Sequence, residues 1–180
     1  MARLPILTVC VSFLTITCAA AERDKDVIVR KVFISSANHE IVMAAGEVSA
    51  CRLSPLPKPT GLGLLNKPRR YEESEKVEVP AELAGRLRDE LNDPETYRLR
   101  RGNPGNGGAG CITNYGVRIF FASESQSLEV NICLGCGDLG LSRNGKFFHE
   151  VRLKRKGDLV AICKLLFPED EAIQRLKASD

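Results

Sequence analysis

Five segments of the chain carry the hydrophobic patterns that are typical of β-strands. Segment 27–35 is rich in β-branched residues, and segment 40–53 predicts one long strand or two short ones, so that a first hairpin turns between the two segments. Segments 117–122 and 128–134 alternate apolar and polar residues and predict a second hairpin. Segment 146–153 alternates in the same way and predicts another strand.

Helical periodicity follows in three places. The leucines of segment 80–92 recur every four residues and predict a helix with Pro80 at its first position. A second helix is expected to begin near residue 157 with Asp158 as its N-cap. A short third helix is expected after Pro168.

The predicted strands cluster in the sequence and do not alternate with helices. This order predicts an α+β fold, with an antiparallel sheet of about five strands and helices packed on one face. A Pro- and Gly-rich segment at about 54–78 interrupts the pattern and predicts a long loop. Residues 22–180 are therefore expected to form a single α+β domain.

Residues 1–21 have the pattern of a secretory signal peptide. Arg3 gives a positive start, an apolar run follows at 4–16, and small residues precede the charged stretch at 22–26. A membrane-spanning helix needs about 20 residues, and this run is shorter. The sequence predicts an exported protein, periplasmic or extracellular, with no membrane span in its mature chain. An uncut anchor, or lipid attachment at Cys18, is the less favoured alternative.

Composition narrows the class of partner. The chain has 26 Lys and Arg against 23 Asp and Glu, a net charge of +3, which indicates neither nucleic acid nor a strongly anionic partner. Trp is absent and aromatic residues make up 6% of the chain, so platforms that stack on bases or sugars are not expected. The expected partner is an unknown protein or a component of the cell envelope.

Cysteines are the residues with the most chemical information in this chain. Of the seven cysteines, Cys10 and Cys18 lie in the predicted signal peptide, so five remain in the mature protein. An exported protein meets oxidising conditions, where cysteines tend to pair. An odd number leaves at least one thiol that is free, bound to a metal or paired with another chain.

The expected register of the second hairpin relates three of these cysteines. If Phe121 pairs with Leu128, the apolar residues of both strands share one face, and slipping by one residue would turn one set outward. Continuing this register makes Cys111 and Cys136 diagonal neighbours, about 7–8 Å apart. A disulfide requires Cα atoms within about 7 Å, so a small shift would allow the bond. Cys133 is expected on the opposite face.

Three interpretations of this cysteine cluster compete. The favoured one is a structural disulfide between Cys111 and either Cys136 or Cys133. A zinc site would add Cys111 and either His149 or Cys163 to the Cys-x-x-Cys pair, but the second close pair typical of zinc sites is missing. The third interpretation is thiol–disulfide exchange at the Cys-x-x-Cys. It is weakened because no helix is predicted after Cys136 to activate the thiol.

The remaining candidates have structural interpretations. His149 lies on an apolar strand face. Its favoured interpretation is a core histidine, and a metal ligand or general base is the alternative. Cys51 and Cys163 are interpreted as buried thiols. No set of catalytic residues emerges from the sequence, which favours a non-enzymatic protein. No cofactor is expected unless zinc is bound.

Cys111 and the segment Ile132-Cys133-Leu134-Gly135-Cys136 stand between a Leu-rich helix and a terminal Leu-Phe-Pro segment. In this arrangement residues 81–176 resemble a family of small exported bacterial proteins of uncharacterised function. The chain departs from the family pattern at Leu134, where an aromatic residue is common, and at 113–115, where a proline-containing stretch is usual. The resemblance implies a fold and no activity.

Overall fold

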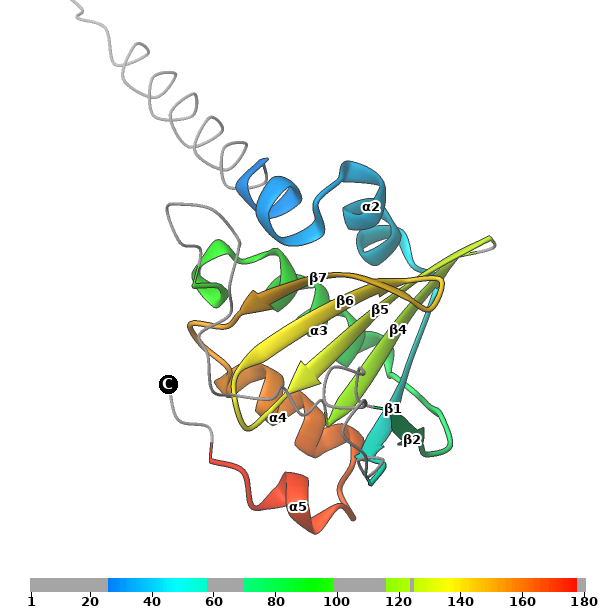
Figure 1. Cartoon of the computed structure of the whole chain (residues 1–180), viewed down its shortest axis with the longest axis vertical. Coiled ribbons are helices and arrows are strands. Elements are labelled where there is room, and N and C mark those ends of the chain that lie inside the picture. Colours follow the sequence, from blue (N-terminus) through cyan, green and yellow to red (C-terminus); the bar gives the residue numbers. More distant parts are fainter. Residues whose placement is uncertain (1–25, 58–69, 99–115, 124, 178–180) are drawn as a thin grey trace, which may run out of the picture.

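The structure is a computed structural model that describes residues 26–57, 70–98, 116–123 and 125–177. The predicted signal peptide and Cys111 lie outside these residues. The described chain forms an antiparallel sheet with helices packed against it (Figure 1), which confirms the predicted α+β fold.

The sheet has seven strands, more than the five expected. Six follow the order β2-β1-β4-β5-β6-β7, and β3 pairs with β1 beside this path. All of the pairs are antiparallel. The strands are β1 (Glu47–Pro55), β2 (Tyr71–Glu73), β3 (Val77–Glu78), β4 (Val117–Ser123), β5 (Gln126–Cys133), β6 (Asp138–Arg143) and β7 (Lys146–Arg152).

The β4–β5 hairpin has the register that the apolar pattern predicts. Phe121 pairs with Leu128, and the other apolar residues of the two strands pair in step. Val48 of β1 pairs with Phe121, and Leu141 of β6 pairs with Val130, so both extend the same face. These five residues are at most 5% exposed. One face of the sheet is therefore a continuous apolar surface.

Helices cover this apolar face. Figure 1 shows α3 and α4 behind the sheet, with the N-terminal helices beside β7. Leu87 and Leu91 of α3 and Leu159 of α4 join the strand residues in one hydrophobic core, as the leucine spacing predicts for α3. The helices are η1 (Val29–Phe33, a π-helix), α2 (Ser36–Ala44), α3 (Ala81–Asn92), η2 (Pro94–Thr96, a 3₁₀-helix), α4 (Gly157–Leu166) and α5 (Glu171–Gln174).

The N-terminal part is helical where the sequence predicts strands. Segment 27–35 contains η1, and segment 40–53 is divided between α2 and β1, so the predicted first hairpin is wrong. Ile28, Val32 and Phe33 are at most 1% exposed. Their burial in the core overrides the preference of β-branched residues for strands.

Smaller differences concern helix ends and short strands. Pro80 is the N-cap of α3 and not its first residue. Asp158 lies in the first turn of α4, whose N-cap is Lys156. The segment at about 54–78 is not all loop, because β1 continues to Pro55 and both β2 and β3 lie within this range. Strand β6 is not among the strands that the sequence predicts.

An ion pair docks α5 against the sheet. Nε of Arg52 on β1 donates to Oδ2 of Asp170 at 2.6 Å, and Oδ1 of Asp170 accepts from the Ile173 amide at 2.9 Å as the N-cap of α5. Partial burial opposes ionisation, but the hydrogen bonds from Ile173 and Arg52 prevail and hold the pKa of Asp170 below its ordinary value. The contribution of this carboxylate to stability is therefore present above about pH 4 and is lost as the pH falls further.

The variant Asp170→Asn is expected to lower the free energy of unfolding by about 1–2 kcal/mol at neutral pH. The wild type loses the same contribution in acid, so the two proteins should converge as the pH falls below the ordinary carboxylate pKa of about 4 and Asp170 becomes protonated. Urea unfolding at several pH values measures this. The exposed carboxylate of Glu171, paired with Arg175, gives the matched control Glu171→Gln, which should change little. A loss that is the same at every pH would contradict the assignment.

Candidate functional site

Cys133 and Cys136 form a disulfide with their Cα atoms 5.6 Å apart. Cys133 is the last residue of β5, and Cys136 lies in the turn that leads into β6. A disulfide in the cysteine cluster agrees with the sequence, but the predicted pairing is wrong. The bond joins the two cysteines of the Cys-x-x-Cys to each other and does not join either of them to Cys111.

The turn after β5 explains the difference. The predicted pairing continues the β4–β5 register beyond residue 133, whereas the chain turns at 134–137 and returns as β6. Gly137 has a φ of 71°, a conformation that glycine adopts without steric cost. Its amide donates to the Cys133 carbonyl at 2.9 Å. Cys136 therefore leaves the plane of the hairpin, and its sulfur faces back to Cys133.

The two sulfur-bearing residues differ in accessibility. Cys133 is 2% exposed, and Cys136 is half-buried. The Cys136 amide donates to Sγ of Cys133 at 3.3 Å. The residues that follow form β6 and not a helix, so the disulfide lacks the helix N-terminus that lowers the pKa of reactive thiols. A reductant would have to enter at Cys136.

His149 is not a core histidine. Its side chain is half-buried, and Nε2 lies 2.9 Å from the Lys31 carbonyl oxygen of η1. It pairs with Leu141 on the apolar face of the sheet, whereas Cys133 follows the parity of Glu129 on the opposite face. His149 thus cannot complete a ligand set with the Cys-x-x-Cys pair.

Cys51 and Cys163 are buried free thiols, as the sequence predicts. Burial, with a smaller effect of Glu73, raises the pKa of Cys51 to about 11. Burial also raises the pKa of Cys163 to about 12. Cys51 faces the polar side of the sheet opposite Arg118, and Cys163 lies on α4 in the apolar core. The two thiols are separated by the sheet and have no route to a shared disulfide.

The native protein should therefore not react at Cys51 or Cys163. At about pH 8 a thiol with a pKa of 11 or more is almost wholly protonated, and only the thiolate is nucleophilic. Iodoacetamide followed by peptide mass mapping should label both thiols in urea and neither in the folded protein. Labelling of either residue at the rate of a free thiol under native conditions would show that its burial is transient.

The cysteine ligands proposed for zinc are not available in this structure. Both thiols of the Cys-x-x-Cys are used by the disulfide. Among residues 26–57, 70–98, 116–123 and 125–177, no group of three or more His, Cys, Asp or Glu side chains could hold a metal ion. The described residues thus offer no centre for the zinc-stabilised module.

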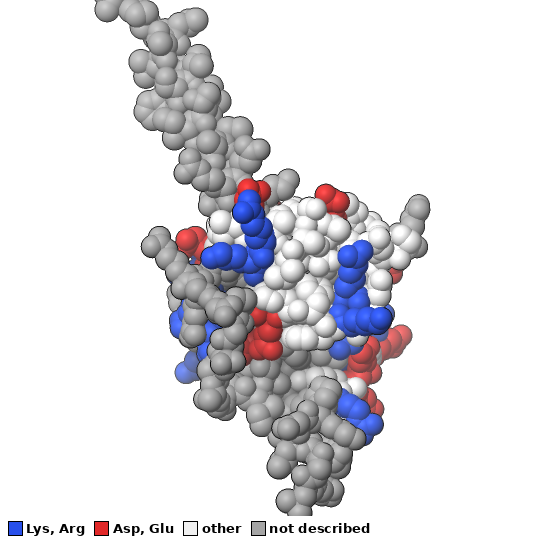
Figure 2. All heavy atoms as spheres, turned by 45° about the horizontal axis from the view of Figure 1, so that its top comes forward, with Lys and Arg blue, Asp and Glu red and all other residues white. Residues whose placement is uncertain are grey.

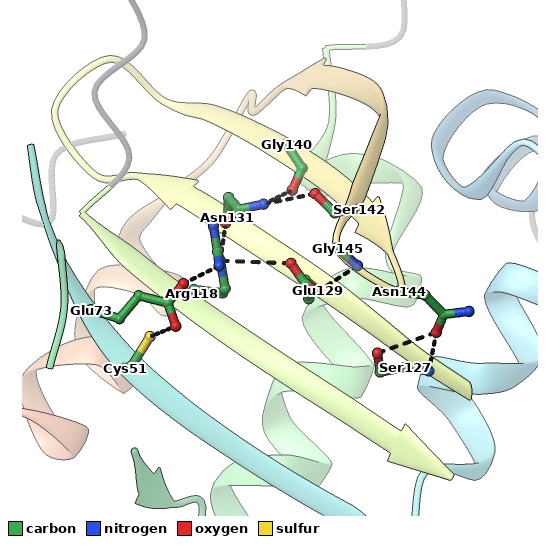
Figure 3. A network of polar contacts seen from close by, with 10 residues as sticks. All are labelled: Cys51, Glu73, Arg118, Ser127, Glu129, Asn131, Gly140, Ser142, Asn144 and Gly145. Atoms are coloured by element: carbon green, nitrogen blue, oxygen red, sulfur yellow. Dashed lines mark hydrogen bonds and ion pairs between the residues drawn. The ribbon is translucent and has the colours of Figure 1, made fainter. Parts of the chain in front are cut away.

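A polar network occupies the face of the sheet opposite to the helices (Figure 3). Arg118 on β4 donates to a carboxylate oxygen of Glu73 and, through Nε at 2.7 Å, to Oδ1 of Asn131. Nε of Arg118 also lies 3.8 Å from a carboxylate oxygen of Glu129. Nδ2 of Asn131 continues the network to Oγ of Ser142 at 3.3 Å. Arg118 thus connects strands β2, β4 and β5 through charge.

Three members of this network are buried although their side chains are polar. Glu129 is 7% exposed, Asn131 3% and Ser142 5%. The other carboxylate oxygen of Glu129 accepts from the Gly145 amide at 2.9 Å. The sequence places Glu129 and Asn131 opposite the apolar face, but alternation alone cannot distinguish a solvated face from a buried one. Nothing in the spacing of Glu73, far away in sequence, indicates that it joins them.

Comparisons of the chain with protein-family models, with characterised proteins and with solved structures found no match. The resemblance to small exported bacterial proteins stays a prediction. In the part of the chain that the structure describes, no helix has the length and apolar character needed to cross a membrane.

Proposed function

We propose that the chain is an exported, non-enzymatic binding module, and that the Cys133–Cys136 disulfide is a permanent structural crosslink. The observation that carries the proposal is the burial of Cys133, which is 2% exposed at the end of β5 and bonded to Cys136. The two free cysteines of the described residues, Cys51 and Cys163, are not activated thiols, because burial raises the pKa of both.

Export fits this interpretation of the disulfide. Disulfides persist in the periplasm and outside the cell and are rare in the cytosol. Residues 1–21 carry the pattern of a signal peptide, so we propose a periplasmic or extracellular location. The partner would then be a protein or another component of the cell envelope. Lipid attachment at Cys18 remains the less favoured form of the same location.

Assays of turnover and of folding together test the proposal. The purified protein should not accelerate the reduction of insulin by dithiothreitol, because Cys133 is shielded from a second disulfide. The variant Cys133→Ser/Cys136→Ser should lose stability and keep its native circular dichroism spectrum. Catalysis of insulin reduction that disappears in this variant would overturn the proposal.

Thiol–disulfide exchange is the second candidate, and one contact favours it. The Cys136 amide points at Sγ of Cys133, and a hydrogen bond to the charged form of an acid stabilises that form. In a reduced protein this contact would lower the pKa of the Cys133 thiol. Alkylation of the reduced protein as a function of pH tests it. A midpoint near the ordinary value of about 8.5 would eliminate this candidate.

A further inference from the structure

A groove lies between the N-terminal helices and the β6–β7 hairpin. Its volume is about 480 Å³, in the range of sites that take small ligands or a few side chains. β6 begins at Asp138, beside the disulfide, and ends at Arg143 in this groove. The groove and the disulfide therefore occupy opposite ends of one strand.

The walls of the groove are apolar and accessible. Ile34, which follows η1, is 51% exposed, and Phe147 on β7 is 57% exposed. Phe148 also lines the groove and packs against the core. Figure 2 shows an uncharged area on this side of the molecule, with Lys and Arg to its left and right and with Asp and Glu at its upper and lower edges. Exposed apolar surface gathered in a hollow is typical of a binding site.

The backbone of Ile34 is strained. Its φ is 67°, and this left-handed conformation is unfavourable for a β-branched residue. The strain does not bury the side chain, which remains half exposed in the wall of the groove. Strained residues of this kind cluster at binding and switch sites. The other described non-glycine residue with positive φ, Asn144, has an ordinary cause, since Asn-Gly is the preferred pair for a two-residue hairpin turn.

The charges at the groove are all positive. Arg143 and Lys146 line it, and its lining contains no Asp or Glu. Arg143 donates to Oδ1 of Asn38 at 3.1 Å and to Oε1 of Gln126 at 2.9 Å, and both acceptors are neutral. Among the described residues neither cation forms an ion pair with a carboxylate. Among the described residues, Arg143 is thus held in place by neutral acceptors alone.

We propose that this groove binds a peptide segment of another protein in which an apolar side chain is flanked by carboxylates. The apolar side chain would enter between Ile34 and Phe147, and the carboxylates would pair with Arg143 and Lys146. A bilayer surface fits less well, because a flat membrane cannot fill a hollow. This proposal rests on the proposed binding function and adds the surface and the chemistry of the partner.

Selection from a random peptide library displayed on phage, with the folded mature protein as bait, tests the proposal. Selected peptides should carry Leu, Ile or Phe next to Asp or Glu. Phe147→Ser and Lys146→Glu should each weaken binding of the best peptide about tenfold or more. Leu165 on α4 is 58% exposed and lies outside the groove, so Leu165→Ser is the matched control and should bind as the wild type does.

A charge swap makes the test specific. For at least one acidic position of a selected peptide, changing that residue alone to lysine should lower affinity for the wild type and restore it for Lys146→Glu. Selected peptides that bind all variants equally would contradict the groove as the binding site, while the proposed binding function would still hold. An empty selection, or binding to phosphatidylglycerol vesicles that Phe147→Ser abolishes, would also overturn the peptide proposal. Insulin reductase activity would instead overturn the proposed function itself.

Discussion

Replacing Arg118 by methionine is expected to lower the free energy of unfolding by about 3 kcal/mol. The substitution removes the only cation within salt-bridge distance of Glu129 among the described residues and leaves that buried carboxylate without a countercharge. It also removes the donor to Asn131, whose Oδ1 accepts from Arg118 at 2.7 Å. An uncompensated buried charge costs far more than the ion pair gains, because desolvation is no longer offset. Urea unfolding at neutral pH measures the loss.

Two further variants separate charge from packing. The double variant Arg118→Met/Glu129→Gln leaves no unpaired charge and should regain most of the lost stability. Glu73 is the exposed partner of Arg118, with 41% of its side chain exposed, so Glu73→Gln should cost less than about 1 kcal/mol. If Arg118→Met were as stable as the wild type, Glu129 would have to be solvated. The burial of Glu129 on the polar face of the sheet would then be wrong.

The variant Cys133→Ser/Cys136→Ser is expected to lose about 2 kcal/mol, the second largest effect. The two residues are three positions apart, so the bond closes a short loop and removes little entropy from the unfolded chain. A disulfide closing a longer loop, as the pairing with Cys111 would, should contribute more. Thermal or urea unfolding of oxidised protein and variant gives the difference.

Reduction of the wild type supplies the control. Reduced wild-type protein and the double serine variant should unfold at nearly the same denaturant concentration, because both lack the crosslink. Peptide binding at the groove should survive in both, since the groove lies at the other end of β6. Equal stability of oxidised protein and variant would contradict the role of the disulfide as a structural crosslink.

Local patterns predict the β4–β5 hairpin correctly for a physical reason. The strands are adjacent in sequence, and their apolar residues form one buried face only in the register with Phe121 opposite Leu128. The same local argument fails beyond residue 133, because one glycine at 137 with positive φ ends the hairpin plane. The tight turn at Gly137 therefore ends the pairing that the β4–β5 register would otherwise continue.

The N-terminal segment shows the opposite case. Its β-branched residues favour a strand locally, yet Ile28 and Val32 are four positions apart and face the core from a helix. That spacing also fits helical periodicity. The segment therefore contains both a helical spacing, which is correct, and a β-branched composition, which wrongly predicts a strand. Only burial against β7 and the other helices decides between them, and a single sequence does not contain this information.

In the candidate sites, too, local patterns predict some features, and others depend on residues far apart in the sequence. Alternation in β5 predicts the face of Cys133, but its partner depends on the turn. The network of Arg118 brings together residues from strands β2, β4, β5 and β6. One of them, Glu73, lies in a segment that the sequence predicts to be a loop. The groove joins Ile34 to Phe147 across more than a hundred residues of sequence, and its strained residue lies where the sequence predicts an ordinary strand.

The redox state of the Cys-x-x-Cys tests the central claim most directly. The folded protein would be equilibrated with glutathione at about −230 mV, near a cytosolic poise, then quenched, alkylated and mapped by mass. A permanent structural crosslink predicts that the peptide with residues 133–136 keeps its internal disulfide. Alkylated thiols at Cys133 and Cys136, or a mixed disulfide of glutathione with Cys136, would contradict the account and identify an exchange centre.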